Sequence, residues 1–183
     1  MRKSILALSS AALLMSVVLG NAHAGQDATL NVTATVLPAT CDISLSTNNL
    51  SLGSFTAAEF TGVATPIASS KKTFNVAVSN CAGTVAVDDQ LKLQVSGVNQ
   101  AGMDTLFTGD NSENNLGIML NTVADQATYI SNNKALDLHT FTGTDASAAN
   151  GAVLSLQAGL ASTSSTPDNG QVRAPIHFSL AYN

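Results

Sequence analysis

The chain has few of the side chains from which catalytic and sugar-binding sites are built. Its 183 residues include no tryptophan, two tyrosines and three histidines, and only 10% of them are charged. With Tyr129 and Tyr182 as the only tyrosines, the sequence offers no aromatic platform for a carbohydrate. Twelve acidic residues against seven basic ones also disfavour binding to nucleic acid or to anionic membranes.

Catalytic and metal-binding patterns are missing as well. His139 and His177 are solitary, without the cysteine or carboxylate spacing of a metal or catalytic site. The stretch "DNSENN" (110–115) has oxygen ligands at alternate positions, but it lacks the central glycine of a calcium loop and has Asn121 where a bidentate acid belongs. We therefore predict a solvated turn at 110–115, no metal or cofactor, and no enzymatic activity.

Residues 1–24 have the features of a secretory signal peptide. Two basic residues at the start precede an apolar run over 5–19, which is too short to span a membrane, and a small-residue cleavage site follows at 22–24. Cleavage leaves 159 residues, enough for one domain with its own core. Five basic and twelve acidic residues then remain, a net charge of about −7. We expect an exported, soluble chain.

Cys41 and Cys81 are the two cysteines of the sequence. An even number in an exported protein indicates a disulfide, because export meets oxidising conditions. Closing a loop of about forty residues stabilises a fold by ~4 kcal/mol in the chain-entropy model. We expect one intrachain disulfide, with two buried free thiols as the alternative.

Alternation of apolar and polar residues predicts strands along the whole exported chain. Turn-rich stretches such as "NQAGMD" and "STSSTPDNG" separate the strands, and only "TAAEF" (56–60) favours a helical turn. Short strands at this spacing are typical of a β-sandwich of the immunoglobulin type, here with an aliphatic core because tryptophan is absent. The runs with a period of two lie at 28–36, 43–52, 74–78, 91–95, 116–120, 136–138, 154–160 and 172–182.

The first and last of these strands need pairing partners. "ATLNVTATV" (28–36) starts close to the expected cleavage site, and "VRAPIHFSLAY" (172–182) continues to within one residue of the end. Each has one apolar face. Each strand therefore completes either the sandwich of its own chain or the sandwich of a neighbour.

Three features together resemble the pilins that Gram-negative bacteria assemble by the chaperone–usher pathway. "VTATVLPATC" (32–41) is similar to the family's Val-x-x-x-Cys opening with one extra residue. The cysteines stand about forty residues apart, as in pilins whose disulfide links the first two strands. The most specific feature is the ending Gly-x-x-x-Ala-x-x-x-Phe-x-x-x-Tyr, which is matched at Gly170, Ala174, Phe178 and Tyr182.

The resemblance implies an all-β fold, an incomplete immunoglobulin-like β-sandwich that lacks its seventh strand and is completed by a donor strand from a neighbouring subunit. Behind the signal peptide it implies a donor-strand extension at 25–37 and a pilin domain at 38–183. The donor residues are then Ala28, Leu30, Val32 and Ala34. Residues near the C terminus then form the wall of the acceptor groove and contact the chaperone: Val172, Ala174, Ile176, Phe178, Leu180, Tyr182 and Asn183.

The partners implied by the resemblance are identical or related pilin subunits, a periplasmic chaperone and an outer-membrane usher. The implied function is that of a structural subunit of a cell-surface fimbria, reached through the periplasm, which polymerises by donor-strand exchange and supports adhesion. A minor adaptor subunit of the fimbria is an alternative within this class. The alternative from another class is a self-contained secreted β-sandwich that binds a carbohydrate or protein ligand, which a stable, compact monomer would favour.

Overall fold

The described part of the chain is built from antiparallel β-strands. The computed structural model describes residues 39–109 and 114–183, so the predicted signal peptide and donor-strand extension lie outside the described residues. Three short 3-10 helices, η1 (Ala57–Glu59), η2 (Ala68–Ser70) and η3 (Ala146–Ala149), lie in the connections. The strands are β1 (Ala39–Leu45), β2 (Lys72–Gly83), β3 (Gln90–Gln100), β4 (Met103–Thr108), β5 (Leu116–Thr122), β6 (Lys134–Thr140), β7 (Val153–Ser162) and β8 (Ile176–Tyr182).

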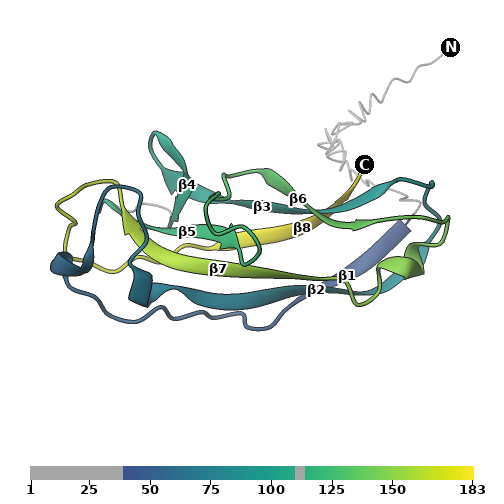
Figure 1. The fold of residues 1–183 in the computed structure, drawn as a ribbon, viewed down its shortest axis with the longest axis horizontal. Helices are drawn as coiled ribbons and strands as arrows, with labels where there is room; N and C mark the ends of the chain where they lie inside the picture. Colours follow the sequence, from purple (N-terminus) through teal and green to yellow (C-terminus); the bar gives the residue numbers. More distant parts are fainter. Residues whose placement is uncertain (1–38, 110–113) are drawn as a thin grey trace, which may run out of the picture. The chain divides into compact units, whose positions relative to one another are not determined.

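The long strand β3 connects two layers of the sandwich. Its residues 90–95 pair with β6 along one edge, residues 91–97 pair with β8 along the other edge, and residues 98–100 pair with β4. The strands β6, β3 and β8 therefore form one layer, and the strands in the order β1-β2-β7-β5-β4 form the other (Figure 1). Each described strand pair is antiparallel, as in an immunoglobulin-like sandwich.

The core between the layers is aliphatic with a few phenylalanines, as the sequence predicts. Its residues occupy every second position of the central strands, because successive side chains of a strand point to opposite faces. Val76, Leu93, Val95, Phe107 and Leu156 have no exposed surface. The complete buried cluster consists of Phe74, Val76, Leu93, Val95, Phe107, Leu120, Ile130, Leu156 and Ala158.

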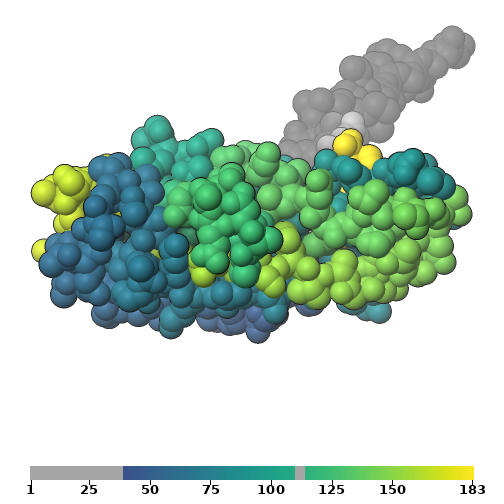
Figure 2. Space-filling view, viewed as in Figure 1, coloured from purple at the N-terminus to yellow at the C-terminus, as the bar shows by residue number. Residues whose placement is uncertain are grey.

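The connections cover the outer face of the larger layer. Ala64 and Tyr129, from two different connections, pack against the buried residues Leu106, Met119 and Ala161. Figure 2 shows this covering as adjacent blue and green segments in the middle of the face. No helix among the described residues is long and apolar enough to cross a membrane.

Most predicted strands are present, with three differences. The predicted strand 43–52 lies at 39–45 in the structure, so Leu50 and Leu52 are outside it. The last strand begins at Ile176 and not at Val172, because Pro175 has no N–H to donate to a ladder. Strand β4 was not predicted, since its buried residues are consecutive and do not alternate. The helical turn predicted at 56–60 is present as η1.

Candidate functional site

Two edge strands, β1 of one layer and β8 of the other, have inward faces that are only half buried. Among the described strands, β1 pairs only with β2, and β8 pairs only with β3. The inward side chains Ile43 and Leu45 of β1, and Ile176 and Phe178 of β8, pack against the core but keep part of their surface exposed. On the strands β2, β3 and β7, Val76, Leu93, Val95 and Leu156 have no exposed surface, so the two edge strands are less well covered than the centre of the sandwich.

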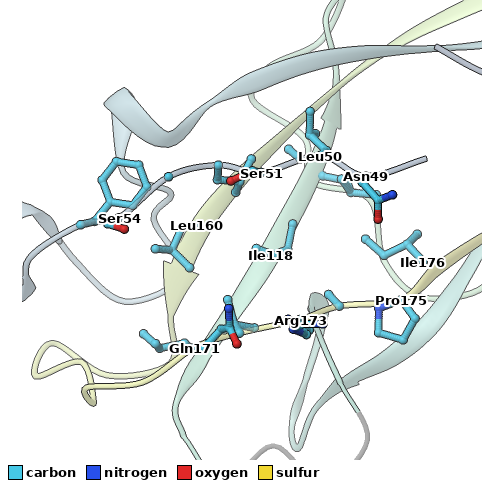
Figure 3. Close-up of a pocket in the computed structure, with 18 of the residues that line it drawn as sticks. Asn49, Leu50, Ser51, Ser54, Ile118, Leu160, Gln171, Arg173, Pro175 and Ile176 are labelled. Carbon is cyan, nitrogen blue, oxygen red and sulfur yellow. The ribbon is translucent and has the colours of Figure 1, made fainter. Parts of the chain in front are cut away.

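A groove with a volume of about 1100 Å³ lies between the two edges. One wall is the segment from Leu45 to Phe55, and the other runs from Pro167 to Phe178. Figure 3 shows Leu50, Ser51 and Ser54 on one side of the groove and Gln171, Arg173 and Pro175 on the other.

The floor of the groove is apolar. Phe74, Leu116, Leu120 and Ala158 line it and are themselves buried, whereas Ile118 and Leu160 are only half buried. Figure 3 shows Ile118 and Leu160 between the two walls. A surface of this kind is stabilised by apolar side chains that remove it from water.

Both walls also present main-chain groups that are not paired with other main chain. Residues 48–55 and 171–175 make no hydrogen bond from main chain to main chain within the described part of the molecule. Unpaired N–H and C=O groups along extended backbone are a template for another strand. The groove therefore offers an apolar floor for side chains and two rims for the backbone of an extended segment.

A disulfide joins β1 to β2, and a tyrosine of β8 contacts this disulfide near one end of the two edge strands. Cys41 of β1 and Cys81 of β2 are bonded, with their Cα atoms 4.0 Å apart, which confirms the predicted disulfide and rules out free thiols. The hydroxyl of Tyr182 lies 3.1 Å from the Sγ of Cys41. The N–H of Cys81 donates to the Oδ1 of Asn150 at 2.8 Å. Burial raises the pKa of the Tyr182 hydroxyl above its ordinary value.

The structure places the predicted wall residues in two groups. Val172, Ala174, Ile176 and Phe178 line the groove, and the ring of Phe178 lies 5.8 Å from the ring of Phe74 on the floor. Leu180 and Tyr182 are on the same face of β8 but lie beyond the groove and pack against the neighbouring buried cluster around Leu91 and Phe141.

Asn183 is exposed, and its main chain exchanges two hydrogen bonds with Gln90 at the start of β3. The predicted donor residues Ala28, Leu30, Val32 and Ala34 lie outside the described residues.

Neither of the two described histidines lines the groove. His177 lies on the exposed face of β8, and the ring of His139 packs edge-on against Phe141 with centroids 4.9 Å apart. The described residues contain no group of three or more His, Cys, Asp or Glu side chains that could hold a metal ion.

Sequence reasoning missed one wall and one polar cluster. Leu50 and Leu52 were assigned to a strand, and their alternation in fact marks the wall opposite β8. Asn114 and Asn115, assigned to a solvated turn, are half buried and hydrogen-bond to the segment 162–171. A pair of asparagines at the start of a strand was the available signal, because their side chains commonly satisfy loop backbone.

The chain is similar to known proteins in its sequence profile and in its fold. The sequence matches the profile of the fimbrial protein family over residues 30–183. The P pilus rod subunit PapA is similar with a TM-score of 0.54 and 18% identity, over 85% of this chain and 99% of that chain. A chain in the structure of a chaperone–usher pilus has a TM-score of 0.49 and 18% identity, over 87% of this chain and 97% of that one. No curated protein matches the sequence.

The likeness to the rod subunit concerns the immunoglobulin-like fold, and the family profile covers most of the chain. On these grounds the chain belongs to the fimbrial protein family and is a structural subunit of a pilus.

Proposed function

We propose that this subunit polymerises by strand exchange through the groove between β1 and β8. In this proposal the extension 25–37 of one copy lies in the groove of the next, and the chain 38–183 is the pilin domain. The role is structural and not catalytic, and the fimbria supports adhesion at the cell surface. A pilus needs association between subunits, and the groove supplies the surface for it.

One observation carries the proposal: a groove of about 1100 Å³ with an apolar floor separates two edge strands whose inward faces are half exposed. In a complete sandwich these faces would be covered by a further strand. The sequence of residues 28–36 has the matching alternation, with small aliphatic residues at every second position.

Burial of the apolar face of the extension would favour such an insertion. Burying four side chains (Ala28, Leu30, Val32 and Ala34) contributes on the order of 5–10 kcal/mol before the cost of ordering the extension. Hydrogen bonds to the rims 48–55 and 171–175 add to this and cover edges that would otherwise aggregate.

Before assembly the same surface requires protection, and we assign this task to a periplasmic chaperone, followed by transfer at an outer-membrane usher. Strand β8 and the groove wall 172–178 are the surface on which a chaperone strand would pair. The exposed terminal residue Asn183 presents a carboxylate at the end of this strand, where a basic side chain can bind it.

The test uses the two faces of the extension. Leu30→Asp and Val32→Asp each place a carboxylate in the apolar groove at a cost of several kcal/mol. Thr33→Asp is the matched control, because it adds the same charge to the opposite face of the same alternating segment. We expect the first two variants to be exported but to remain unpolymerised, and the control to form fibres, as seen by electron microscopy and by ladders in unheated gels.

Normal fibres from Leu30→Asp would show that the extension is not the donor. A stable, compact monomer of the mature wild-type chain in size-exclusion chromatography would instead support a self-contained binding module.

A further inference from the structure

The side chain and main chain of Asn115, at the start of β5, hold the connection between β7 and β8. Its Oδ1 accepts from the hydroxyl of Ser162 at 3.0 Å and from the N–H of Asp168 at 2.9 Å. Its Nδ2 donates to the carbonyl of Thr166 at 3.1 Å, and its own N–H donates to the Oδ2 of Asp168 at 2.9 Å. Its carbonyl accepts from the N–H of Thr163 at 2.9 Å. Both lone pairs of the amide oxygen are therefore used within one segment.

The main chain on either side of Asn115 is held in turn by Gln100 of β3. The Nε2 of Gln100 in β3 donates to the carbonyls of Asn114 and Leu116, at 2.7 and 2.9 Å, which flank Asn115. We call this arrangement of Gln100, Asn115 and Asp168 the Asn115 hub. It connects the layer that contains β3 and β8 to the layer that contains β5 and β7, at the position where the β7–β8 connection turns towards the groove.

The groove wall continues directly from the hub. Residues 167–175 line the groove, and they are bounded by Asp168 on one side and by the start of β8 at Ile176 on the other. Between these two points Ala174 packs against the core, and two contacts link the wall to neighbouring segments. Asn114 Nδ2 donates to the carbonyl of Gln171 at 3.2 Å, and the backbone of Arg173 lies against Gly109.

We propose that Asn115 and Asp168 are positioning residues that hold the wall 167–175 in place before a strand enters the groove. The proposal rests on the proposed function, because it assigns the hub to uptake of the donor strand. An extended segment that meets a preformed rim loses only its own conformational entropy. If the hub is broken, the wall must be ordered in the same step, and that cost slows entry.

The contact between Asn115 and Asp168 can be tested with near-isosteric substitutions, because Asp168 is charged. Asn115→Asp retains the acceptor oxygen but has two other effects: it places a second carboxylate beside that of Asp168, so the two repel each other, and it removes the Nδ2 donor to the carbonyl of Thr166. Asp168→Asn in the same chain removes this repulsion and retains an oxygen that can accept from the N–H of residue 115. Rescue in the double variant therefore identifies the contact itself and not a general defect in folding.

The experiment uses the mature chain with Leu30→Asp and Val32→Asp, which prevents donation by its own extension. A fluorescent peptide with the sequence of residues 25–37 is mixed with this chain, and the association rate is followed by anisotropy, with the urea unfolding midpoint measured in parallel. Ser165→Ala is the matched control, since the exposed side chain of Ser165 makes no hydrogen bond with the described residues.

We expect Asn115→Ala and Asn115→Asp to slow association by about tenfold, which corresponds to about 1.4 kcal/mol of ordering cost. The double variant Asn115→Asp/Asp168→Asn should recover part of the rate, because the repulsion is removed while the donor to Thr166 is still missing, and Ser165→Ala should leave the rate unchanged. A lowered unfolding midpoint with an unchanged association rate would assign the hub to stability alone and overturn the proposal, as would an absence of rescue. If the peptide fails to bind even the background chain, the proposed function fails and the positioning role fails with it.

Discussion

The hydroxyl of Tyr182 donates a hydrogen bond to the Sγ of Cys41 at 3.1 Å, and so connects the last strand to the first. The direction is fixed because a disulfide sulfur has no hydrogen to give. The contact lies at the end of the edge strands where Leu180 and Tyr182 pack against the second buried cluster. It therefore bridges the two edges next to the open groove.

Removing this hydroxyl should have a small effect at neutral pH and a distinct one at alkaline pH. Tyr182→Phe loses one hydrogen bond to a weak acceptor, about 0.5–1 kcal/mol of the free energy of unfolding. Because burial raises the pKa of Tyr182 from 10.0, the unfolded chain binds fewer protons than the folded chain above about pH 10, and stability falls as pH rises. Urea unfolding from pH 7 to 11 should show a shallower alkaline decline in the variant; parallel declines would contradict this.

Loss of the disulfide should be much more costly than loss of the tyrosine hydroxyl. Cys41 and Cys81 are 40 residues apart, and opening a loop of this length destabilises the fold by ~4 kcal/mol in the chain-entropy model. Paired Cys41→Ser and Cys81→Ser changes should lower the urea midpoint accordingly. Reductant should lower the midpoint of the wild type and have no effect on the double variant, which serves as the control.

Residues added after Asn183 should interfere with capture before assembly. The main chain of Asn183 is paired with Gln90, so the position of the terminal carboxylate is defined by the β3 ladder. A short C-terminal tag removes this carboxylate from Asn183, and we expect loss of chaperone co-purification and a lower periplasmic level. The same tag placed before residue 25 of the mature chain is the control. A C-terminally tagged subunit that still accumulates as a chaperone complex would show that the carboxylate is not used.

The two Asn-Gly pairs of the chain should deamidate at different rates. Spontaneous deamidation requires the glycine nitrogen to attack the asparagine amide carbon, with loss of ammonia and hydrolysis of the cyclic imide to aspartate or isoaspartate. At Asn150 this is hindered, because the N–H of Gly151 donates to Val78 at 2.9 Å and the Oδ1 of Asn150 accepts from Cys81.

Asn169 and Gly170 in the groove wall are exposed, and neither the side chain of Asn169 nor the N–H of Gly170 has a hydrogen-bond partner among the described residues. Peptide mass spectrometry after prolonged incubation at mildly alkaline pH should find deamidation at residue 169 well before residue 150. Equal rates at the two sites would contradict the assignment.

The strand pattern was predictable from the sequence because burial in a sandwich imposes a period of two. Runs such as Phe74–Val76–Val78 and Leu91–Leu93–Val95 have one face in the core, and their alternation shows this directly. Strand β4 has no such signal. Leu106, Phe107 and Thr108 are all buried, because both faces of β4 are covered. The core covers its inner face, and connections between strands cover its outer face.

The groove wall that includes β8 was equally predictable, but the opposite wall was not. Ile176 and Phe178 follow the period of the last strand, so their shared face could be inferred. Alternation alone does not distinguish a paired strand from an extended rim, which is why Leu50 and Leu52 were assigned wrongly. The contacts of Asn115 depend on residues near 165, and no local pattern in the sequence relates the two segments.

Strand β8 also has a consequence for the order of folding. Leu91, Leu93 and Val95 of β3 are fully buried, yet one edge of this strand is covered only by β8, whose residues are the last of the described chain to be reached along the sequence. Pairing between such distant segments is slow, because a long loop must be closed before any contact forms. Until β8 has docked, β3 has an open edge, although it pairs with three other strands in the finished sandwich. Any change that delays the docking of β8 lengthens this interval, and so raises losses to aggregation even where the stability of the final structure is unaltered.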